Sequence, residues 1–342
     1  MHSVDKALAP VPPAADCWYL TGPTAAGKTQ VGVELALRLG AEIISLDSMA
    51  LYQGMNIGTA KPPPVDQARV QHHLLDLIPP TEEFSLSEYI DAAHAAIADI
   101  KGRGREVLFV GGTPLYLKSL LRGVYQGPPA DWEFRQQVDR ELEALPLAAL
   151  HERLQVIDPL LAAKLHPNDK RRIIRGLEVF KLTGQRLSHL QTQFDEAQSA
   201  SSANVFVLSW PRDELHRRID TRVEQMFATG LVEEVRGLLS RYGTLGRTAM
   251  QAVGYREVIE YVSPPLPLFP SPSLAACIDR VKSRTRQFAR RQETWFRSLS
   301  ECTLVPMQTD FDAAQVANTI LGLAESASGR THRPTTNSRL EK

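Results

Sequence analysis

The stretch Gly22–Thr29, which reads GPTAAGKT, decides the fold. It matches the phosphate-binding loop G-x-x-x-x-G-K-[ST] at every fixed position, between an apolar run and an amphipathic helix. The backbone N–H groups of such a loop converge on an anion, and the positive end of the following helix adds to the attraction. The loop therefore predicts a bound phosphate, with Lys28 at its terminal charge and Thr29 as a Mg²⁺ ligand.

Strands and helices alternate around this loop. Short apolar runs predict strands at residues 17–20, 42–47, 106–112 and 204–210. Apolar side chains at helical spacing predict helices at residues 28–39 and 87–100. Continuous apolar strands separated by helices are typical of a parallel sheet. We therefore predict an α/β fold, in which a phosphate-loop core with helices on both faces of a parallel sheet carries an inserted helical subdomain.

Composition shifts predict the boundaries along the chain. The expected parts are a disordered N-terminus (1–15), the first part of the core (16–127), the helical insertion (128–203), the second part of the core (204–324) and a disordered tail (325–342). The insertion ends in a Ser/Ala-rich loop at 194–204, and 261–273 is a proline-rich connector. A helix or helix pair is predicted from residue 212, with a break at Gly230.

Composition also limits partners and location. The 39 Lys and Arg balance the 39 Asp and Glu, so a polyanion would have to meet a local basic patch. The three cysteines make neither a disulfide framework nor a zinc site. We find no signal peptide and no apolar run long enough for a membrane span, so we expect a cytoplasmic protein. No feature argues against a monomer.

The second predicted strand ends in a carboxylate, Asp47, whereas the third ends in VGGT at 110–113. An NTPase would be expected to carry its metal-binding acid after the third strand. Because the C-terminal ends of parallel strands meet at one edge, Asp47 should face the phosphate loop. There it could complete a metal shell or act as a general base. A helix cap or a buried ion pair is the structural alternative.

Two basic segments offer local patches. A helix predicted from Asn168 or Asp169 buries an apolar stripe and turns Arg171, Arg172 and Arg175 outward. The segment 280–297 interleaves Phe288, Trp295 and Phe296 with the cations Arg280, Lys282, Arg284, Arg286, Arg290, Arg291 and Arg297. Backbone phosphates of a nucleic acid are the natural counter-charge, and a solvated helix face is the alternative.

Taken together, these segments resemble the tRNA dimethylallyltransferases, also called tRNA isopentenyltransferases, in their bacterial form. The similarity runs in family order from about Trp18 to Arg297 and rests on GPTAAGKT, DSMALYQGMNIGTAKP (47–62), HHLLDL (72–77), VGGTPLYLKSLL (110–121), HPNDKRRIIRGLEVF (166–180), QAVGYRE (251–257) and TRQFARRQETWFR (285–297). One departure is Ala26, where the family often has Ser. The chain also lacks the C-terminal zinc finger of some eukaryotic members, so no zinc is expected.

The resemblance implies transfer of a dimethylallyl group from dimethylallyl diphosphate, with Mg²⁺, to N6 of adenosine 37 in the tRNA anticodon loop. It implies that Asp47, Lys28 and Thr24 are catalytic, with Asp47 as the base that deprotonates the amine. The implied diphosphate site consists of Gly22, Pro23, Thr24, Ala25, Ala26, Gly27, Lys28, Thr29 and Arg218, with Thr29 as the metal ligand.

The resemblance also implies a tRNA site, and the helical insertion would clamp the anticodon stem-loop. Because a stacked adenine cannot reach the crevice, the target base would be flipped out. The implied tRNA contacts are Asp47, Ser48, Met49, Ala50, Thr113, Arg135, Arg171, Arg172, Ile173, Ile174, Arg175, Gln251, Ala252, Val253, Gly254, Tyr255 and Arg256.

Three other functions are compatible with parts of this pattern. A P-loop phosphotransferase or NTPase would bind ATP at the same loop, but it lacks the expected acid after Val110. A prenyltransferase acting on free adenine nucleotides would share the loop and the base, but would leave the insertion and both basic segments without a role. A non-catalytic tRNA-binding module would not need Asp47.

Overall fold

A computed structural model describes residues 11–125, 127–191, 204–263 and 273–328. The chain forms two compact units. One consists of residues 15–118 and 200–342 and is called the core unit below. The other, called the helical unit, consists of residues 119–199 together with residues 1–14. The helical unit thus begins nine residues before the expected start of the insertion at 128, which places the end of α4 (Pro114–Arg122) in it.

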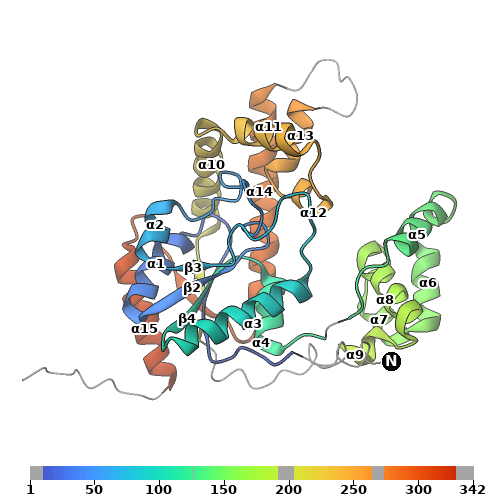
Figure 1. Cartoon of the computed structure of the whole chain (residues 1–342), viewed down its shortest axis with the longest axis horizontal. Helices are drawn as coiled ribbons and strands as arrows, with labels where there is room; N and C mark the ends of the chain where they lie inside the picture. Colours follow the sequence, from blue (N-terminus) through green and yellow to red (C-terminus); the bar gives the residue numbers. More distant parts are fainter. Residues whose placement is uncertain (1–10, 126, 192–203, 264–272, 329–342) are drawn as a thin grey trace, which may run out of the picture. The chain divides into compact units, whose positions relative to one another are not determined.

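The core unit contains a six-stranded sheet in the order β3-β2-β4-β1-β5-β6 (Figure 1). Its strands are β1 (Trp18–Thr21), β2 (Ala41–Leu46), β3 (His72–His73), β4 (Glu106–Gly111), β5 (Asn204–Ser209) and β6 (Thr303–Pro306). All neighbouring strands pair in parallel. The predicted α/β fold with a parallel sheet is therefore confirmed, although the short strands β3 and β6 were not predicted.

Helices cover both faces of this sheet. Helices α1 (Lys28–Leu39) and α15 (Ala313–Ser328) pack together on one face, where Leu20 and Leu108 join their apolar core. Successive strand residues point to opposite faces. Accordingly, Tyr19 and Phe109 stack on each other, with ring centroids 5.0 Å apart. Helix α3 (Leu86–Gly102) packs against β2 and β4 from the side opposite α1 (Figure 1).

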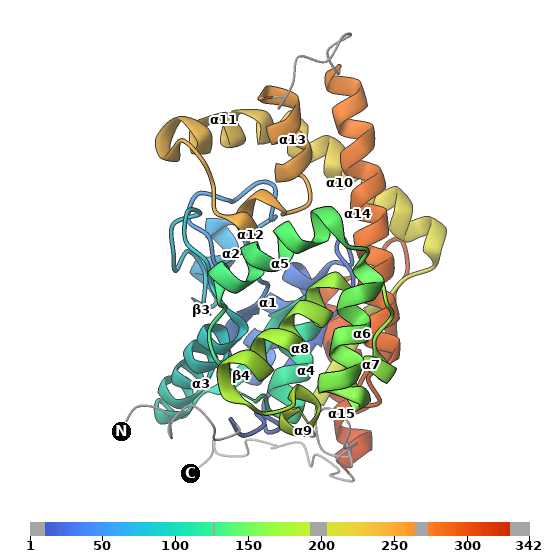
Figure 2. The same cartoon turned by 90° about the vertical axis from the view of Figure 1, so that its right-hand side faces the viewer.

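Further helices complete the core unit. They are α2 (Pro64–Arg69), α10 (Arg212–Ala228), α11 (Leu231–Tyr242), α12 (Arg247–Met250), α13 (Tyr255–Val262) and α14 (Leu274–Arg297). Gly230 separates α10 from α11 with φ 103, as its predicted role as a break requires. Figure 2 shows the long helix α14 running beside α10.

The helical unit has its own apolar core. Helices α5 (Trp132–Ala144), α6 (Leu147–Ile157), α7 (Pro159–Lys164), α8 (Lys170–Thr183) and α9 (Leu187–Leu190) follow α4. Val138, Leu154 and Leu177 are among the buried side chains that join α5, α6 and α8. Asp169 caps α8, because its Oδ1 accepts a hydrogen bond from the N–H of Arg172.

The ends of the chain differ from expectation in two places. The N–H of Val11 donates to the carbonyl of Val124, and the N–H of Ala14 donates to the carbonyl of Leu120, so residues 11–14 are held by the helical unit. Helix α15 continues to Ser328, so residues 325–328 are helical rather than part of a disordered tail. The other expected tail residues, most of the Ser/Ala-rich loop and the centre of the proline-rich connector lie outside the described residues.

Within the described ranges, every helix is too short or too polar to cross a bilayer.

We predict that Gly111→Ala lowers the free energy of unfolding by about 3 kcal/mol or more, because an added methyl group would meet the backbone of β2. A Cβ at this position would lie 2.2 Å from the carbonyl oxygen of Leu46. Gly102→Ala is the matched control, because a Cβ there meets nothing within 4 Å, and we expect a change within about 1 kcal/mol. Urea unfolding of both variants checks this, and equal midpoints would contradict it.

Candidate functional site

The phosphate loop has the backbone conformation of an anion-binding turn. Gly22 and Gly27 have φ 145 and φ 93, values that a residue with a Cβ rarely adopts. Gly27 also lies against the ring of Phe311, since a Cβ on it would be 2.7 Å from that ring. Gly27 precedes α1, and no side chain caps the helix. The first N–H groups of α1 are therefore available to a bound anion.

Lys28 folds back over this loop. Its Nζ donates to the carbonyl oxygens of Gly22 at 2.9 Å and Pro23 at 2.8 Å. The pKa of Lys28 is lowered to about 7, mainly by burial and also by the nearby charge of Arg222, while the charge of Asp47 acts in the opposite direction. Lys28 is thus a buried cation within electrostatic reach of one carboxylate and one further cation.

Asp47 lies at the end of β2 in a turn tied to the end of β4. Its Oδ1 accepts a hydrogen bond from the N–H of Met49 at 2.8 Å. The Oγ1 of Thr113 accepts from the N–H of Ser48, and the N–H of Thr113 donates to the carbonyl of Leu46. The two strand ends therefore bring Asp47, Ser48 and Thr113 together, beside the loop that carries Lys28.

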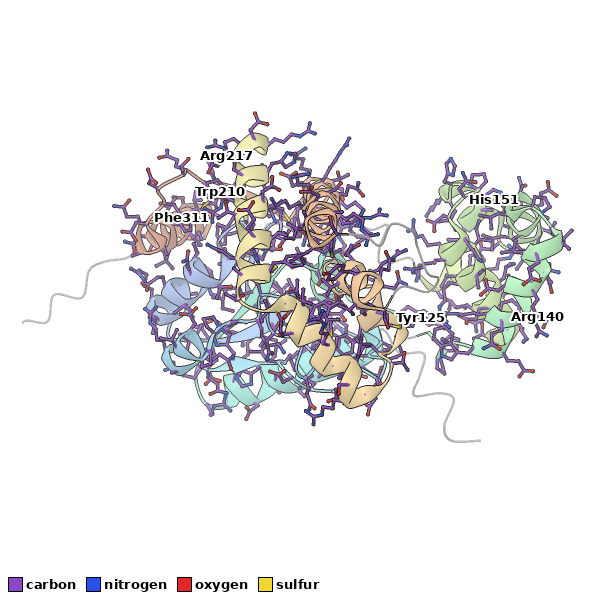
Figure 3. The ribbon with its side chains drawn as sticks, turned by 90° about the horizontal axis from the view of Figure 1, so that it is seen from above. Tyr125, Arg140, His151, Trp210, Arg217 and Phe311 are labelled. Carbon is purple, nitrogen blue, oxygen red and sulfur yellow. The ribbon has the colours of Figure 1, made fainter. Side chains whose placement is uncertain are left out.

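Arg218 supports the loop from α10. Its Nε donates to the carbonyl of Ala25 at 2.9 Å, and its guanidinium lies 4.2 Å from the ring centroid of Trp210. Trp210 donates from Nε1 to the carbonyl of Ala26, and Figure 3 shows Trp210 and Phe311 side by side near the start of α10. The Arg218 guanidinium is thus engaged with backbone carbonyls and aromatic rings of the folded chain.

Arg222 follows Arg218 by one helical turn and was missed in the sequence analysis. Its charge acts on both Lys28 and Asp47, and burial lowers its pKa. Arg222 makes no hydrogen bond or ion pair with a residue that the structure describes. A signal did exist in the sequence, because positions four apart lie on the same face of a helix, and Arg218 was already a candidate.

A second loop, Met55–Lys61, is held by one carboxylate of α11. Glu234 accepts hydrogen bonds from the N–H groups of Asn56, Ile57 and Gly58, and from the hydroxyl of Tyr255. Gly58 packs so closely that a Cβ would lie 2.4 Å from the Tyr255 ring. These contacts tie the segment after Asp47 to the start of α13, which lies within the predicted tRNA contacts 251–256.

The predicted tRNA contacts of the helical unit have different environments. Glu178 is fully buried, and it pairs with Arg135 at 2.7 Å and with Arg175 at 2.5 Å. Burial favours its neutral form, but the two arginines lower the pKa of Glu178 overall. The side chains of Ile173 and Ile174 are buried in the core of the unit, so only their main chains could meet tRNA. Arg171 and Arg172 are exposed.

Three of the seven cations of the basic segment on α14 pair with acids of other helices. Arg280 pairs with Glu260, Lys282 with Glu224 and Arg286 with Asp220. These acids belong to α13 and α10, so they could not be identified from the segment itself. The other four cations, Arg284, Arg290, Arg291 and Arg297, are exposed.

No group of three or more His, Cys, Asp or Glu side chains in the described ranges could hold a metal ion. The hydroxyl of Thr29, the predicted Mg²⁺ ligand, makes no hydrogen bond with any residue that the structure describes. A magnesium ion commonly keeps several waters and uses one or two protein oxygens together with substrate phosphates. The site therefore fits an ion that arrives with a phosphate ligand, and not a permanent protein cage.

Comparisons with known proteins identify relatives along most of the chain. The IPP transferase family model matches residues 50–299. A tRNA dimethylallyltransferase of Rhodopirellula baltica is 48% identical over 309 residues, covering 88% of this chain and 91% of the relative. One from Geobacter metallireducens is 42% identical and covers 88% of this chain and 95% of its own length.

Solved structures agree with the sequence relatives. The tRNA isopentenylpyrophosphate transferase of Bacillus halodurans matches with a TM-score of 0.64 and 36% identity, covering 92% of this chain and 98% of its own. A eukaryotic dimethylallyltransferase acting on tRNA matches with a TM-score of 0.73 and 26% identity, covering 93% and 81%.

We predict that Lys28 makes stability depend on pH. Its pKa is about 7 in the folded protein against an ordinary 10.5, so between these values the unfolded chain binds the extra proton. Its contribution to the free energy of unfolding should therefore rise with pH in this window, by at most about 1.4 kcal/mol per pH unit.

Urea unfolding at pH 7, 8 and 9 checks this, with Lys28→Met as the reference that lacks the titrating group. Inorganic diphosphate should flatten the slope in the wild type, because a bound anion favours the charged lysine. Parallel pH profiles for the two proteins would contradict the prediction.

Proposed function

The chain belongs to the IPP transferase family, and from this premise we propose that it transfers a dimethylallyl group from dimethylallyl diphosphate to N6 of adenosine 37 in tRNA. The observation that carries the proposal is the meeting of Asp47 with Lys28 and Arg222 beside a phosphate loop. Strand β4, the third of the predicted strands, ends in Gly111, without the acid that an NTPase would use for its metal. A base, two cations and an anion site suit displacement of a diphosphate better than attack by water.

The donor chemistry requires a stabilised leaving group. When the C1–O bond of an allylic diphosphate breaks, both electrons leave with the diphosphate oxygen, and positive charge develops on the allyl group. The N–H groups at the start of α1, together with Lys28 and Arg222, would stabilise the negative charge that develops on the leaving group. These groups are fixed before the reaction, so little reorganisation is needed.

The acceptor chemistry requires a base. The N6 amine attacks C1, forms the new C–N bond, and must lose a proton. The Asp47 carboxylate lies on the same sheet edge as the loop, and its second oxygen, Oδ2, has no hydrogen-bond partner among the described residues. We assign to this oxygen the hydrogen bond to the amine and the acceptance of its proton.

Mg²⁺ fits this site as a companion of the diphosphate. Thr29 would offer its hydroxyl to the ion, and the diphosphate and waters would supply the other oxygens. When bound, the ion would neutralise charge on the leaving group. Thr24 would contact the same diphosphate through its side chain, because its N–H is already bonded within the protein.

The proposed tRNA contacts divide by environment. In the core unit, Ser48 and Thr113 are positioned by their mutual hydrogen bonds to border the flipped adenosine, and residues 251–256 are tied to the Asp47 segment through Glu234. In the helical unit, the exposed side chains of Arg171 and Arg172 would meet phosphates, and Arg172 would do so in place of its exposed pair with Asp169 at 3.7 Å. Arg135 would hold α5 against α8 through its pair with Glu178, and Arg175 would orient Glu178 from within α8.

Mass analysis of nucleosides tests the proposal. Unmodified tRNA incubated with the protein, Mg²⁺ and dimethylallyl diphosphate should contain adenosine that has gained one five-carbon unit. We expect Asp47→Asn to lower the turnover by about 100-fold or more, because the base is lost, whereas Asp99→Asn on the exposed face of α3 should leave it unchanged. A parallel reaction with ATP should show no phosphate release. Release of phosphate from ATP with unmodified tRNA would favour the phosphotransferase instead.

Arg218 and Arg222 of α10 should affect different measurements. We expect Arg222→Gln to raise the KM for dimethylallyl diphosphate by about tenfold or more with little change in stability. Arg218→Gln should instead lower the free energy of unfolding by about 1–2 kcal/mol, because it loses the contact with Trp210 and the bond to Ala25. The measurements are steady-state kinetics and urea unfolding of both variants. The opposite pattern would exchange the two roles.

A further inference from the structure

A glutamine of α14 joins the phosphate loop to the end of β4. Gln292 is 4% exposed. Its Oε1 accepts a hydrogen bond from the N–H of Thr24 at 2.9 Å, and its Nε2 donates to the carbonyl of Gly112 at 2.6 Å. One buried side chain from a distant helix therefore holds two backbone groups of the site, which lie on different strand ends.

The two partners fix the chemistry that this position requires. A backbone N–H can only donate and a carbonyl can only accept, so they set the orientation of the amide without ambiguity. A side chain that meets both must carry a donor and an acceptor on a planar end group. Glutamine does so, whereas ionised glutamate lacks the donor and methionine lacks both groups.

The amide lies among the groups that would hold the diphosphate. A Cβ built on Gly112 would lie 2.6 Å from Nε2 of Gln292, 3.1 Å from the carbonyl oxygen of Gly22 and 3.4 Å from Nζ of Lys28. Lys28 binds the carbonyls of Gly22 and Pro23, and Gln292 binds the next N–H along the chain. Two side chains thus hold consecutive peptide units at the start of the loop: Lys28 binds the carbonyl groups, and Gln292 binds an N–H group.

The helix that carries Gln292 is itself fixed to α10. Lys282 of α14 pairs with Glu224, and Arg286 pairs with Asp220. Helix α10 also carries Arg222, whose charge acts on Lys28. Gln292 and Arg222 therefore reach the phosphate loop from two helices that are joined by ion pairs.

We propose that Gln292 is a positioning residue for diphosphate: it holds the peptide that joins Pro23 to Thr24 in the anion-binding conformation before the ligand arrives. Binding then need not supply the free energy that orders this part of the loop, so the affinity for diphosphate is higher. The inference rests on the proposed function only in taking the phosphate to be the diphosphate of the prenyl donor.

The test compares Gln292→Met and Gln292→Glu with Gln287→Met, which makes the same replacement at an exposed position of the same helix. Calorimetry with inorganic diphosphate and Mg²⁺ measures the dissociation constant, and steady-state kinetics measure the KM values for dimethylallyl diphosphate and tRNA. For Gln292→Met we expect the dissociation constant and the donor KM to rise about tenfold, with the tRNA KM unchanged. Gln292→Glu should bind diphosphate more weakly still, because its carboxylate repels the anion. Gln287→Met should match the wild type.

Gly112→Ala is a second perturbation that leaves Gln292 in place but displaces its amide, and it should reproduce the weaker diphosphate binding. Folding is followed by thermal unfolding of every variant. Unchanged diphosphate binding in a folded Gln292→Met or Gly112→Ala protein overturns the inference. So does a rise confined to the tRNA KM. A wild type that binds inorganic diphosphate but transfers no dimethylallyl group overturns the proposed function alone, since the calorimetric comparison still decides the role of Gln292.

Discussion

The parallel pairing of β1 with both β4 and β5 is the constraint on which the candidate site depends. Trp18 aligns with Leu108 on one side and with Asn204 on the other. Because the strands run in the same direction, the phosphate loop, Gly112 and the entry to α10 all leave the sheet at one edge. The pairing of β2 with β4 adds Asp47 to that edge. Residues far apart in the chain thereby reach one anion site.

Charge at this edge is arranged for a ligand and not for the protein alone. Lys28 and Arg222 are both partly buried, and burial lowers the pKa of each. The charge of Arg222 also lowers the pKa of Lys28, whereas the charge of Asp47 raises the pKa of both. Holding two cations together in a poorly solvated place is unfavourable until an anion joins them. A diphosphate carries more than one negative charge and would relieve the repulsion of both. Under the proposed function, this unfavourable electrostatic energy would favour binding of a multiply charged anion over a singly charged one.

The local sequence pattern was sufficient to predict the framework of strands and helices. It was not sufficient to predict the contacts between elements that are far apart in the chain. Helix α1 occupies the predicted residues, because an intact loop motif and a regular apolar stripe both mark its start. Strand β6 was missed, since three of its four residues are exposed at a sheet edge, which leaves little apolar pattern. Gln292 could not have been found from its neighbours, because its partners lie 268 and 180 residues away. The same holds for the acids that neutralise α14, and for the pairing of Arg135 with Glu178.

The loop Met55–Lys61 surrounds the carboxylate of Glu234, and this contact can be compared with the one that the phosphate loop would make to its ligand. Successive N–H groups of Asn56, Ile57 and Gly58 surround a carboxylate, much as the backbone of the phosphate loop would surround a ligand. In the loop Met55–Lys61 the anion is a side chain of the same protein and is therefore always present, so this turn is a permanent part of the fold. Under the proposed function, the phosphate loop would instead surround a diphosphate that arrives from solution and leaves as product, so its anion would be exchangeable. The same kind of turn would thus serve twice, once as a permanent structural contact and once as an exchangeable anion site.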